Sequence, residues 1–356
     1  MLSNYKEKLD NLKYLALEGA LYSRSGLYFL ESYPLLYIDQ FIRFGKLKVP
    51  KEQLSEDDLL NEVQNLIKKD IENIKNGLYP LSALRFENPL KHSLNLLKIY
   101  KDSIKVNFNK RNNKSKVFSK KAKAKTKELP DYYTRNFHHQ TDGYLSEESA
   151  SLYDQQVEML FRGTADLMRR MILEPMRKQF DRDERFKVLE VSSGTGVSTY
   201  PLAKTFKNAR IIATDLSSDY ISHSQKNYSN FKNVSFRVGQ AENLEAKDNF
   251  FDAWCSTYMF HELPKNIRTE VLKEAYRVLK PGGQIYLVDS IQDGDNPLFE
   301  DLLDQFPQNF HEPFYKNYIQ NPMEGMVKEA GFESVESSYR FSSKVVWGTK
   351  PLSKKA

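Results

Sequence analysis

The chain has 356 residues, a length typical of about two domains, and its 53 basic and 47 acidic residues give a formal net charge of +6. A single cysteine, Cys255, excludes a disulfide framework and a thiolate metal cluster. No stretch reaches the ~18 consecutive apolar residues of a membrane span, and the first residues lack the apolar core of a signal peptide. We therefore expect a cytoplasmic protein without a membrane span.

Residues 1–104 are predicted to form a helical N-terminal domain. Apolar residues recur three and four positions apart over 59–74 and again over 90–104, which is the spacing of one helix face. Aromatic residues are frequent over 22–44. For each of them, packing inside a helical core is favoured over lining a pocket for a flat, apolar substrate.

The positive charge is concentrated in one segment. Ten basic residues and no acidic residue lie between Lys105 and Lys127, so the rest of the chain has a formal net charge of −4. The segment is rich in Lys, Asn and Ser, and we expect residues 105–130 to form a basic, flexible linker. Because the charge is local, the overall excess of positive charge says little about what an active site accepts.

The second half of the chain has the pattern of an α/β domain. Residues 131–185 are predicted as a helical lead-in or lid with one long helix over about 146–180. In residues 186–356, short apolar runs alternate with helical patterns, which is typical of a doubly wound, mostly parallel sheet. The predicted strands are 186–192, 210–215, 233–238, 250–257, 284–290, 332–339 and 344–349, the last two as a terminal antiparallel hairpin.

A glycine-containing loop follows the first predicted strand. Gly194 and Gly196 precede a helical pattern, where glycine lets the backbone approach a ligand closely. Asp215 ends the second strand, 21 residues after Gly194, and an acid at that distance accepts hydrogen bonds from the ribose of a nucleoside cofactor. A dinucleotide site would have a third glycine where Thr199 stands, whereas Glu190 suits the cationic amino group of a methionine moiety. The pattern therefore favours S-adenosylmethionine over a dinucleotide.

Further motifs follow in a consistent order. They are Leu189–Gly196, Ala213–Ser217, Gly239–Leu244, Phe251-Asp252 and Glu274–Gly283. With these motifs, residues 186–350 resemble the class I S-adenosylmethionine-dependent methyltransferases, in particular the small-molecule group that includes the quinone-biosynthesis C-methyltransferases. The resemblance implies a seven-stranded Rossmann-like sheet with one antiparallel strand. It also implies S-adenosyl-L-methionine as the cofactor and S-adenosyl-L-homocysteine as the product.

The same resemblance implies which residues contact the cofactor. The glycine loop passes under the methionine and ribose, the acid of the second strand binds the ribose, and the pair after the third strand lines the adenine end. The implied cofactor-binding residues are Glu190, Ser192, Gly194, Gly196, Asp215, Leu216, Ala241, Glu242 and Tyr258. Ser192 stands where the loop of this family usually has its first glycine, which is a departure from the pattern.

In this family the methyl acceptor faces the loop after the fourth strand, here residues 256–263. His261 is the candidate base or substrate orienter, because histidine titrates near neutrality, and the alternative is a helix cap or packing beside the cofactor. Asp289, at the end of the fifth strand, is the second catalytic candidate. Candidate substrate residues are Tyr153, His138, His311 and Tyr315. His138 and His139 have no cysteine or acid at metal-ligand spacing, so no metal site is expected.

The leading hypothesis is methyl transfer to a small, flat or apolar molecule by in-line displacement, with the acceptor oriented near the end of the fourth strand. The chain lacks the Asp/Asn-Pro-Pro-Tyr/Phe motif of amino-methylating nucleic-acid enzymes and the Pro-Cys nucleophile of cytosine C5 enzymes, so nucleic acid is not the expected substrate. Two alternatives stay open. One is an RNA or protein methyltransferase that grips its substrate through residues 105–127, and the other is a non-catalytic S-adenosylmethionine-binding protein. The sequence makes no prediction of the oligomeric state.

Overall fold

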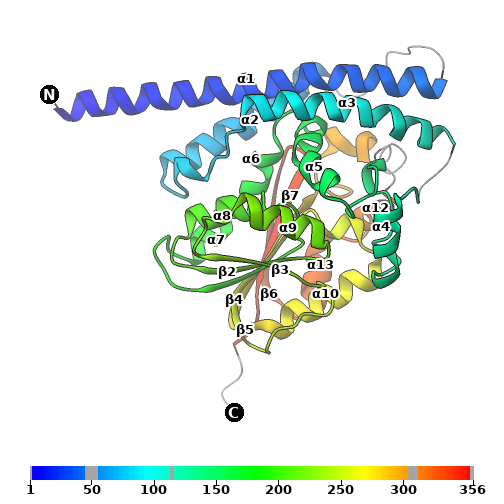
Figure 1. The fold of residues 1–356 in the computed structure, drawn as a ribbon. Coiled ribbons are helices and arrows are strands. Elements are labelled where there is room, and N and C mark those ends of the chain that lie inside the picture. The colour runs from blue at the N-terminus through cyan, green and yellow to red at the C-terminus, as the bar shows by residue number, and fades with distance from the viewer. Residues whose placement is uncertain (1, 45–54, 113–115, 304–305, 307–311, 353–356) are drawn as a thin grey trace.

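The computed structural model describes residues 2–44, 55–112, 116–303, 306 and 312–352. The N-terminal part contains the helices α1 (Leu2–Phe44), α2 (Glu56–Lys75) and α3 (Pro89–Arg111). Helices α1 and α3 run alongside each other, and the first turns of α1 extend beyond the rest of the molecule (Figure 1). None of the helices in the described ranges combines the length and the hydropathy needed to span a bilayer.

The N-terminal helices share one hydrophobic core with the rest of the protein. They pack against three helices of the lead-in, α5 (Glu147–Leu160), α6 (Ala165–Arg170) and α7 (Leu173–Gln179). Leu17 of α1 and Met168 of α6 belong to the same buried cluster as Val188 in the first strand. Arg170 adds a buried ion pair, because its guanidinium donates two hydrogen bonds of 2.8 Å to Asp70 on α2. The segment predicted as a separate helical domain is therefore joined to the lead-in by a continuous core.

The single helix predicted over 146–180 is wrong, because the chain turns sharply after α5. Gly163 has a φ of 77° in this turn. A Cβ at Gly163 would lie 3.0 Å from the ring of Tyr28 and 3.1 Å from the Cα of Ser25, both on α1. Helix α1 thus approaches the turn so closely that only glycine fits without displacement, and the chain resumes as α6 and α7 beyond it.

A seven-stranded sheet with the order β3-β2-β1-β4-β5-β7-β6 forms the second half of the protein. Its strands are β1 (Lys187–Val191), β2 (Arg210–Asp215), β3 (Val234–Val238), β4 (Phe251–Thr257), β5 (Leu279–Ser290), β6 (Glu333–Arg340) and β7 (Ser343–Thr349). Strands β1 to β5 pair in parallel, and β7 runs antiparallel to both β5 and β6. The predicted doubly wound sheet with a C-terminal antiparallel hairpin is confirmed.

Helices flank this sheet and complete the fold (Figure 1). They are α8 (Thr199–Thr205), α9 (Ser218–Asn227), α10 (Lys265–Val278), α12 (Tyr315–Ile319) and α13 (Met323–Glu329). Short 3₁₀ turns are η1 (Leu81–Ala83), η2 (Thr126–Glu128), η3 (Phe137–His139), η4 (Phe260–Glu262) and η5 (Pro297–Phe299). The strand order reverses between β1 and β4, and in doubly wound sheets this reversal leaves a crevice for ligands at the carboxyl ends of the strands.

Part of the linker predicted over 105–130 is helical and packs against the protein. Helix α3 continues into this range, and α4 (Lys120–Lys125) follows. The backbone N–H of Ser119 donates to the Asp142 carboxylate at 2.6 Å, and the last lysine of α4 forms an ion pair with Asp219 on α9. Carboxylates of the lead-in and of α9 therefore hold this part of the basic segment, where a flexible tether was expected.

Candidate active site

One pocket lies at the carboxyl ends of β1, β2 and β4, beside the reversal of the strand order. The empty space in it is about 910 Å³ with the solvent at its open mouth included. Predicted site residues that line it are Tyr153, Ser192, Gly194, Asp215, Leu216, Ala241, Glu242 and Tyr258. Predicted site residues that are described but do not line it are Glu190, Gly196, His138, His261, Asp289 and Tyr315. His311 lies outside the described residues.

The glycine loop, residues 192–196, presents open backbone to the pocket. Gly194 has a φ of 55°, and no described atom lies within 4 Å of the position that a Cβ would take, so a ligand can approach the backbone there. Gly196 has a φ of 82° and is confined by packing, because a Cβ would lie 2.8 Å from the ring of Tyr228. Ser192 has a φ of 54°, a conformation that costs a residue with a Cβ about 1–2 kcal/mol. This explains why glycine is usual at that position.

Asp215 ends β2 and turns its carboxylate toward the glycine loop. Oδ2 accepts the backbone N–H of Gly194 at 2.9 Å, and Oδ1 accepts that of Ser217 at 2.8 Å. Burial raises the pKa of Asp215 to about 6 against the effect of these hydrogen bonds, and the charge of Glu262 adds to the rise. A carboxylate oxygen can accept more than one hydrogen bond, so both oxygens can also receive hydroxyl donors from a ligand in the pocket.

Glu190 lies behind the glycine loop and does not line the pocket. Its side chain accepts the hydroxyl of Thr199 at 2.5 Å through Oε2, and Oε1 has no hydrogen-bond partner among the described residues. Burial raises the pKa of Glu190 to about 7, and the charge of Asp215 contributes in the same direction. Glu190 therefore carries one unpaired oxygen beneath the loop, available to a cationic group or to a bridging water.

The lead-in segment contributes tyrosines to the pocket that sequence reasoning did not assign. Tyr132 and Tyr133 line the pocket, and the hydroxyl of Tyr132 donates to Oε1 of Glu242 at 2.5 Å. The amide of Gln240 donates to the same oxygen at 2.8 Å, so the loop after β3 is tied to the lead-in. The high density of aromatic residues over 131–144 is the sequence feature that could have indicated that this segment lines the pocket.

Four aromatic side chains, here called the aromatic wall, form another side of the pocket. They are Phe137, Tyr144, Tyr153 and Tyr220. Phe137 stacks on Tyr144 with ring centroids 5.7 Å apart, and Tyr144 meets Tyr153 and Tyr220 edge-on at 5.7 and 5.5 Å. The hydroxyl of Tyr144 donates to Oε1 of Glu262 at 2.5 Å. The hydroxyl of Tyr220 is anchored as well, 2.8 Å from Oγ of Ser149. The wall therefore offers apolar ring surface with anchored hydroxyl groups, which suits a planar ligand.

His261 and Asp289 form a buried pair behind the loop after β4. Nδ1 of His261 lies 2.5 Å from Oδ1 of Asp289, and the carboxylate also accepts the backbone N–H groups of Phe260 and Ser290 at 2.7 Å. Burial lowers the pKa of His261, but the charge and hydrogen bond of Asp289 outweigh it and raise the pKa above its ordinary value. Tyr315 packs edge-on against the His261 ring at 6.0 Å. Asp289 thus holds the imidazole by Nδ1, which leaves Nε2 as the ring nitrogen that is not bound to Asp289.

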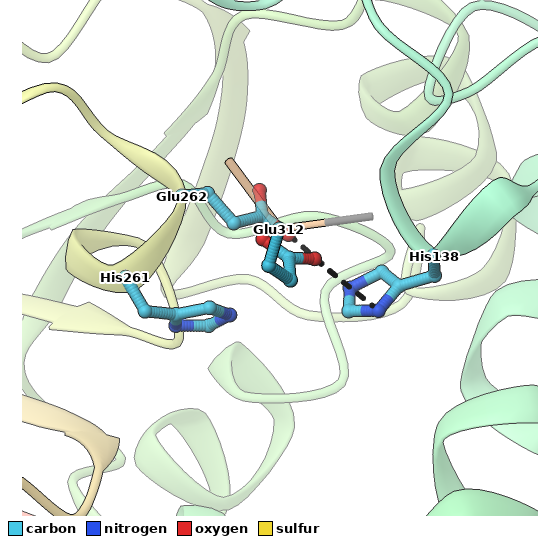
Figure 2. A group of neighbouring side chains, drawn as sticks. All are labelled: His138, His261, Glu262 and Glu312. Carbon is cyan, nitrogen blue, oxygen red and sulfur yellow. Dashed lines mark ion pairs between the residues drawn. The ribbon is translucent and has the colours of Figure 1, made fainter. Parts of the chain in front are cut away.

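A second histidine reaches this region from the lead-in. Nε2 of His138 lies 3.3 Å from Oε1 of Glu262, and Nδ1 lies 3.5 Å from Oε1 of Glu312 (Figure 2). Burial raises the pKa of Glu312 well above its ordinary value, with the charges of Glu262 and Asp289 adding to the rise. The expectation that His138 has no acidic partner is therefore corrected. Its partners are distant in the sequence, where ligand spacing cannot reveal them.

The strand order, the open glycine loop and the carboxylate at the end of β2 define a nucleoside-cofactor site at the switch point of a doubly wound sheet. Residues 188–283 match the family described as "Methyltransferase domain". These residues span β1 to the first part of β5, and they include the glycine loop, Asp215 and His261.

Curated relatives agree with the family match. A demethylmenaquinone methyltransferase of Chlorobaculum parvum is 28% identical over 213 residues, which cover 54% of this chain and 84% of that protein. A ubiquinone/menaquinone biosynthesis C-methyltransferase of Rickettsia prowazekii is 33% identical over 109 residues, covering 29% of this chain and 43% of that protein. A solved methyltransferase structure from Thermotoga maritima is 20% identical and covers 57% of this chain and 97% of its own, with a TM-score of 0.43. The chain is an S-adenosylmethionine-dependent methyltransferase with S-adenosyl-L-methionine as its cofactor, and it is similar to the quinone-biosynthesis C-methyltransferases.

The residues at the pocket fit this cofactor. The position beside Gly194 that a Cβ would fill is open, and Asp215 presents two acceptor oxygens next to it. Glu190 holds an unpaired buried oxygen beneath the same loop. An adenosyl group with ribose hydroxyls and a cationic methionine moiety supplies the donors and the positive charge that these carboxylates lack.

Proposed function

We propose that this enzyme methylates a small, flat or apolar molecule bound between the aromatic wall and the loop after β4. The observation that carries the proposal is the continuity of the pocket, which joins the glycine loop and Asp215 to the aromatic wall and to Tyr258 and Glu262. A flat acceptor in this space is packed by rings on one side and reaches the methyl-donor end on the other. The demethylmenaquinone methyltransferases among the relatives are named for an acceptor of this shape.

The protein's own contribution to the reaction is binding, orientation and proton removal. When bound, S-adenosylmethionine supplies an already activated methyl group. Asp215 and the glycine loop hold the ribose, and the aromatic wall orients the acceptor and excludes water. His261 does not line the pocket, so it takes up the acceptor's proton at Nε2 through a bridging water, and Asp289, whose Oδ1 lies 2.5 Å from Nδ1, stabilises the imidazolium that results. Tyr258, whose hydroxyl is tied to Ser343 at 2.6 Å, holds its ring at the mouth between the two ligands.

A thiophilic acceptor is disfavoured, although arsenite methyltransferases are also among the relatives. The one thiol of the chain, Cys255, is buried inside β4. Burial raises the pKa of the Cys255 thiol well above its ordinary value, so its thiolate form is suppressed. A site that captures a soft arsenic centre needs accessible thiolates, and none faces this pocket in the described residues.

The proposal is tested by incubating the full-length protein with S-adenosylmethionine and three acceptor classes in parallel. These are demethylated quinols and naphthols, total RNA, and a protein mixture, and the measurement is S-adenosylhomocysteine formed above the rate without acceptor. We expect turnover with the aromatic small molecules only. Turnover with RNA or protein and none with the small molecules would reject the small-molecule proposal in favour of a macromolecular substrate. S-adenosylhomocysteine binding without turnover on any acceptor would instead support a non-catalytic binding protein.

A further inference from the structure

Four side chains from three separate segments converge beside the acceptor side of the pocket. They are His138 from the lead-in, His261 and Glu262 from the loop after β4, and Glu312 from the segment after β5. Each offers one ligand atom, and these atoms all lie within 4.8 Å of one another. Figure 2 shows Glu312 lying between the two histidines with its carboxylate turned toward the others. Two imidazoles and two carboxylates form a donor set that divalent first-row metal ions prefer.

Glu312 is a buried carboxylate that accepts no hydrogen bond from the described residues. It is 1% exposed, and neither of its oxygens accepts a hydrogen bond from any residue that the structure describes. Nδ1 of His138, which faces it, is likewise buried without a hydrogen bond in the described part of the chain. Leaving such groups unpaired in a protein interior is costly, and fully buried carboxylates are normally paired or bound to a metal. The carboxylate therefore points into a position that a cation would fill.

The spacing of the cluster is close to, but looser than, the coordination shell of a small divalent ion. Bonds of about 2.0–2.2 Å to a tetrahedral centre place its ligand atoms about 3.4 Å from one another. The separations of 3.3 Å to Glu262 and 3.5 Å to Glu312 involve the two different ring nitrogens of His138, of which only one can bind the ion. Taken one atom per residue, the four ligand atoms lie within 4.8 Å of one another, so small side-chain movements bring them onto one ion. With both histidines neutral and both glutamates ionised, the cluster carries two negative charges, which a divalent ion neutralises.

The surroundings of His261 and Glu262 are those of metal ligands with orienting partners. Asp289 holds Nδ1 of His261 and is itself fixed by two backbone N–H groups, which leaves Nε2 for a metal. Metal-binding histidines commonly donate their other ring N–H to a carboxylate in this way. Tyr144 donates to Oε1 of Glu262 and so holds that ligand from the aromatic wall. The pair previously described as a base and its partner thus also has the geometry of a carboxylate–histidine–metal unit.

We infer that His138, His261, Glu262 and Glu312 bind one divalent metal ion of the zinc class, which fastens the lead-in and the segment after β5 to the loop after β4. The inference does not depend on the proposed acceptor class, but it excludes His261 as the base when the ion is bound, because a metal-bound Nε2 has no lone pair for a proton. Glu262 lines the pocket, so the ion is bound at the border of the acceptor space. Mg²⁺ is not the expected occupant, because it prefers an octahedral shell of oxygen ligands with several waters.

The test uses full-length, tag-free protein stripped with a chelator and then titrated with Zn²⁺, Co²⁺ or Mg²⁺. We expect one equivalent of Zn²⁺ by calorimetry, a visible absorption band of tetrahedral Co²⁺ that Zn²⁺ abolishes, and a higher melting temperature with Zn²⁺ but not with Mg²⁺. In Asp289→Asn the affinity for Zn²⁺ should fall by ~10–100-fold, which is the usual effect of losing an orienting partner. In His138→Ala and Glu312→Gln the loss should be larger.

His223→Ala is the matched control, because it removes a histidine outside the cluster and should leave the Zn²⁺ affinity unchanged. S-adenosylhomocysteine binding is measured on every variant to show that it is folded, and this readout also separates a failed metal site from a failed methyltransferase assignment. If Glu312→Gln does not fold, His138→Ala decides. Stripped wild-type protein that takes up no stoichiometric Zn²⁺ or Co²⁺ would overturn the inference. So would His138→Ala and Glu312→Gln proteins that bind Zn²⁺ as wild type does.

Discussion

Replacing Asp215 by asparagine changes one charge in the cofactor pocket with little change in volume. In the native site the carboxylate accepts the backbone N–H groups of Gly194 and Ser217 at 2.9 and 2.8 Å. The asparagine carboxamide has one oxygen, so it can satisfy one of these donors, and its NH₂ group then faces the other. The ribose hydroxyls of a bound cofactor also lose their ionised acceptor.

We expect this substitution to weaken S-adenosylhomocysteine binding by roughly 10–150-fold. The range corresponds to about 1.5–3 kcal/mol, the usual contribution of a hydrogen bond to a charged group. The measurement is isothermal titration calorimetry at pH 8, where a carboxyl with a pKa of about 6 is ionised.

Asp252→Asn is the matched control for this experiment. Asp252 lies at the opposite end of β4, where it accepts the backbone N–H of Lys187 at 2.8 Å and pairs with Lys280. Its substitution should lower the free energy of unfolding and leave S-adenosylhomocysteine affinity unaltered. An affinity of the Asp215→Asn protein within twofold of wild type would refute the assignment of Asp215 to the ribose.

Three further results are expected. The contribution of Asp215 to the stability of the cofactor-free protein should be lost as the pH rises from about 4 to 6, because the folded state retains a proton on Asp215 (pKa about 6) that the unfolded state, with the ordinary value of 3.8, has released. The measurement is the free energy of unfolding in urea at several pH values, and the difference between wild type and Asp215→Asn should fall across this range. Arg85→Ala should weaken S-adenosylhomocysteine binding several-fold, as measured by calorimetry. Arg85 donates a hydrogen bond of 3.0 Å to Asp154, and Asp154 accepts the hydroxyl of Thr195 in the glycine loop at 2.5 Å. An unchanged affinity would show that these contacts do not support cofactor binding. His261→Ala should lower turnover while S-adenosylhomocysteine affinity stays near wild type, and unaltered turnover would remove His261 from the mechanism.

Strands β1, β2, β4, β5 and β7 could be predicted because each contains a short, mostly buried apolar run with its own local signal, whereas β6 is largely exposed. The predicted strand over 210–215 coincides with β2, and the other six differ from the structure by a few residues at their ends. The same locality explains why the sequence could place the glycine loop and Asp215 at one pocket, since β1 and β2 pair in parallel. The pattern of apolar residues predicts secondary structure well wherever the local sequence alone determines the conformation.

The failures concern features that depend on a distant part of the chain. The turn at Gly163 exists because α1 packs against it, and nothing within 146–180 records that neighbour except the glycine itself. His138 and Glu312 meet only after the lead-in and the segment after β5 have folded onto the same side of the sheet. Short-range spacing of possible metal ligands in the sequence therefore could not reveal this cluster, although the folded chain brings the donor atoms together.

Because of the continuous hydrophobic core described above, we expect the N-terminal helices and the sheet to unfold together in heat or denaturant. Leu17 and Leu21 of α1 are buried in the same cluster as residues of β1 and β4. Cofactor binding then stabilises the whole folded state, including helices that do not contact the cofactor. Amide hydrogens in α2 should exchange more slowly once S-adenosylhomocysteine is bound, so the N-terminal helices would report occupancy of a pocket on the other side of the core.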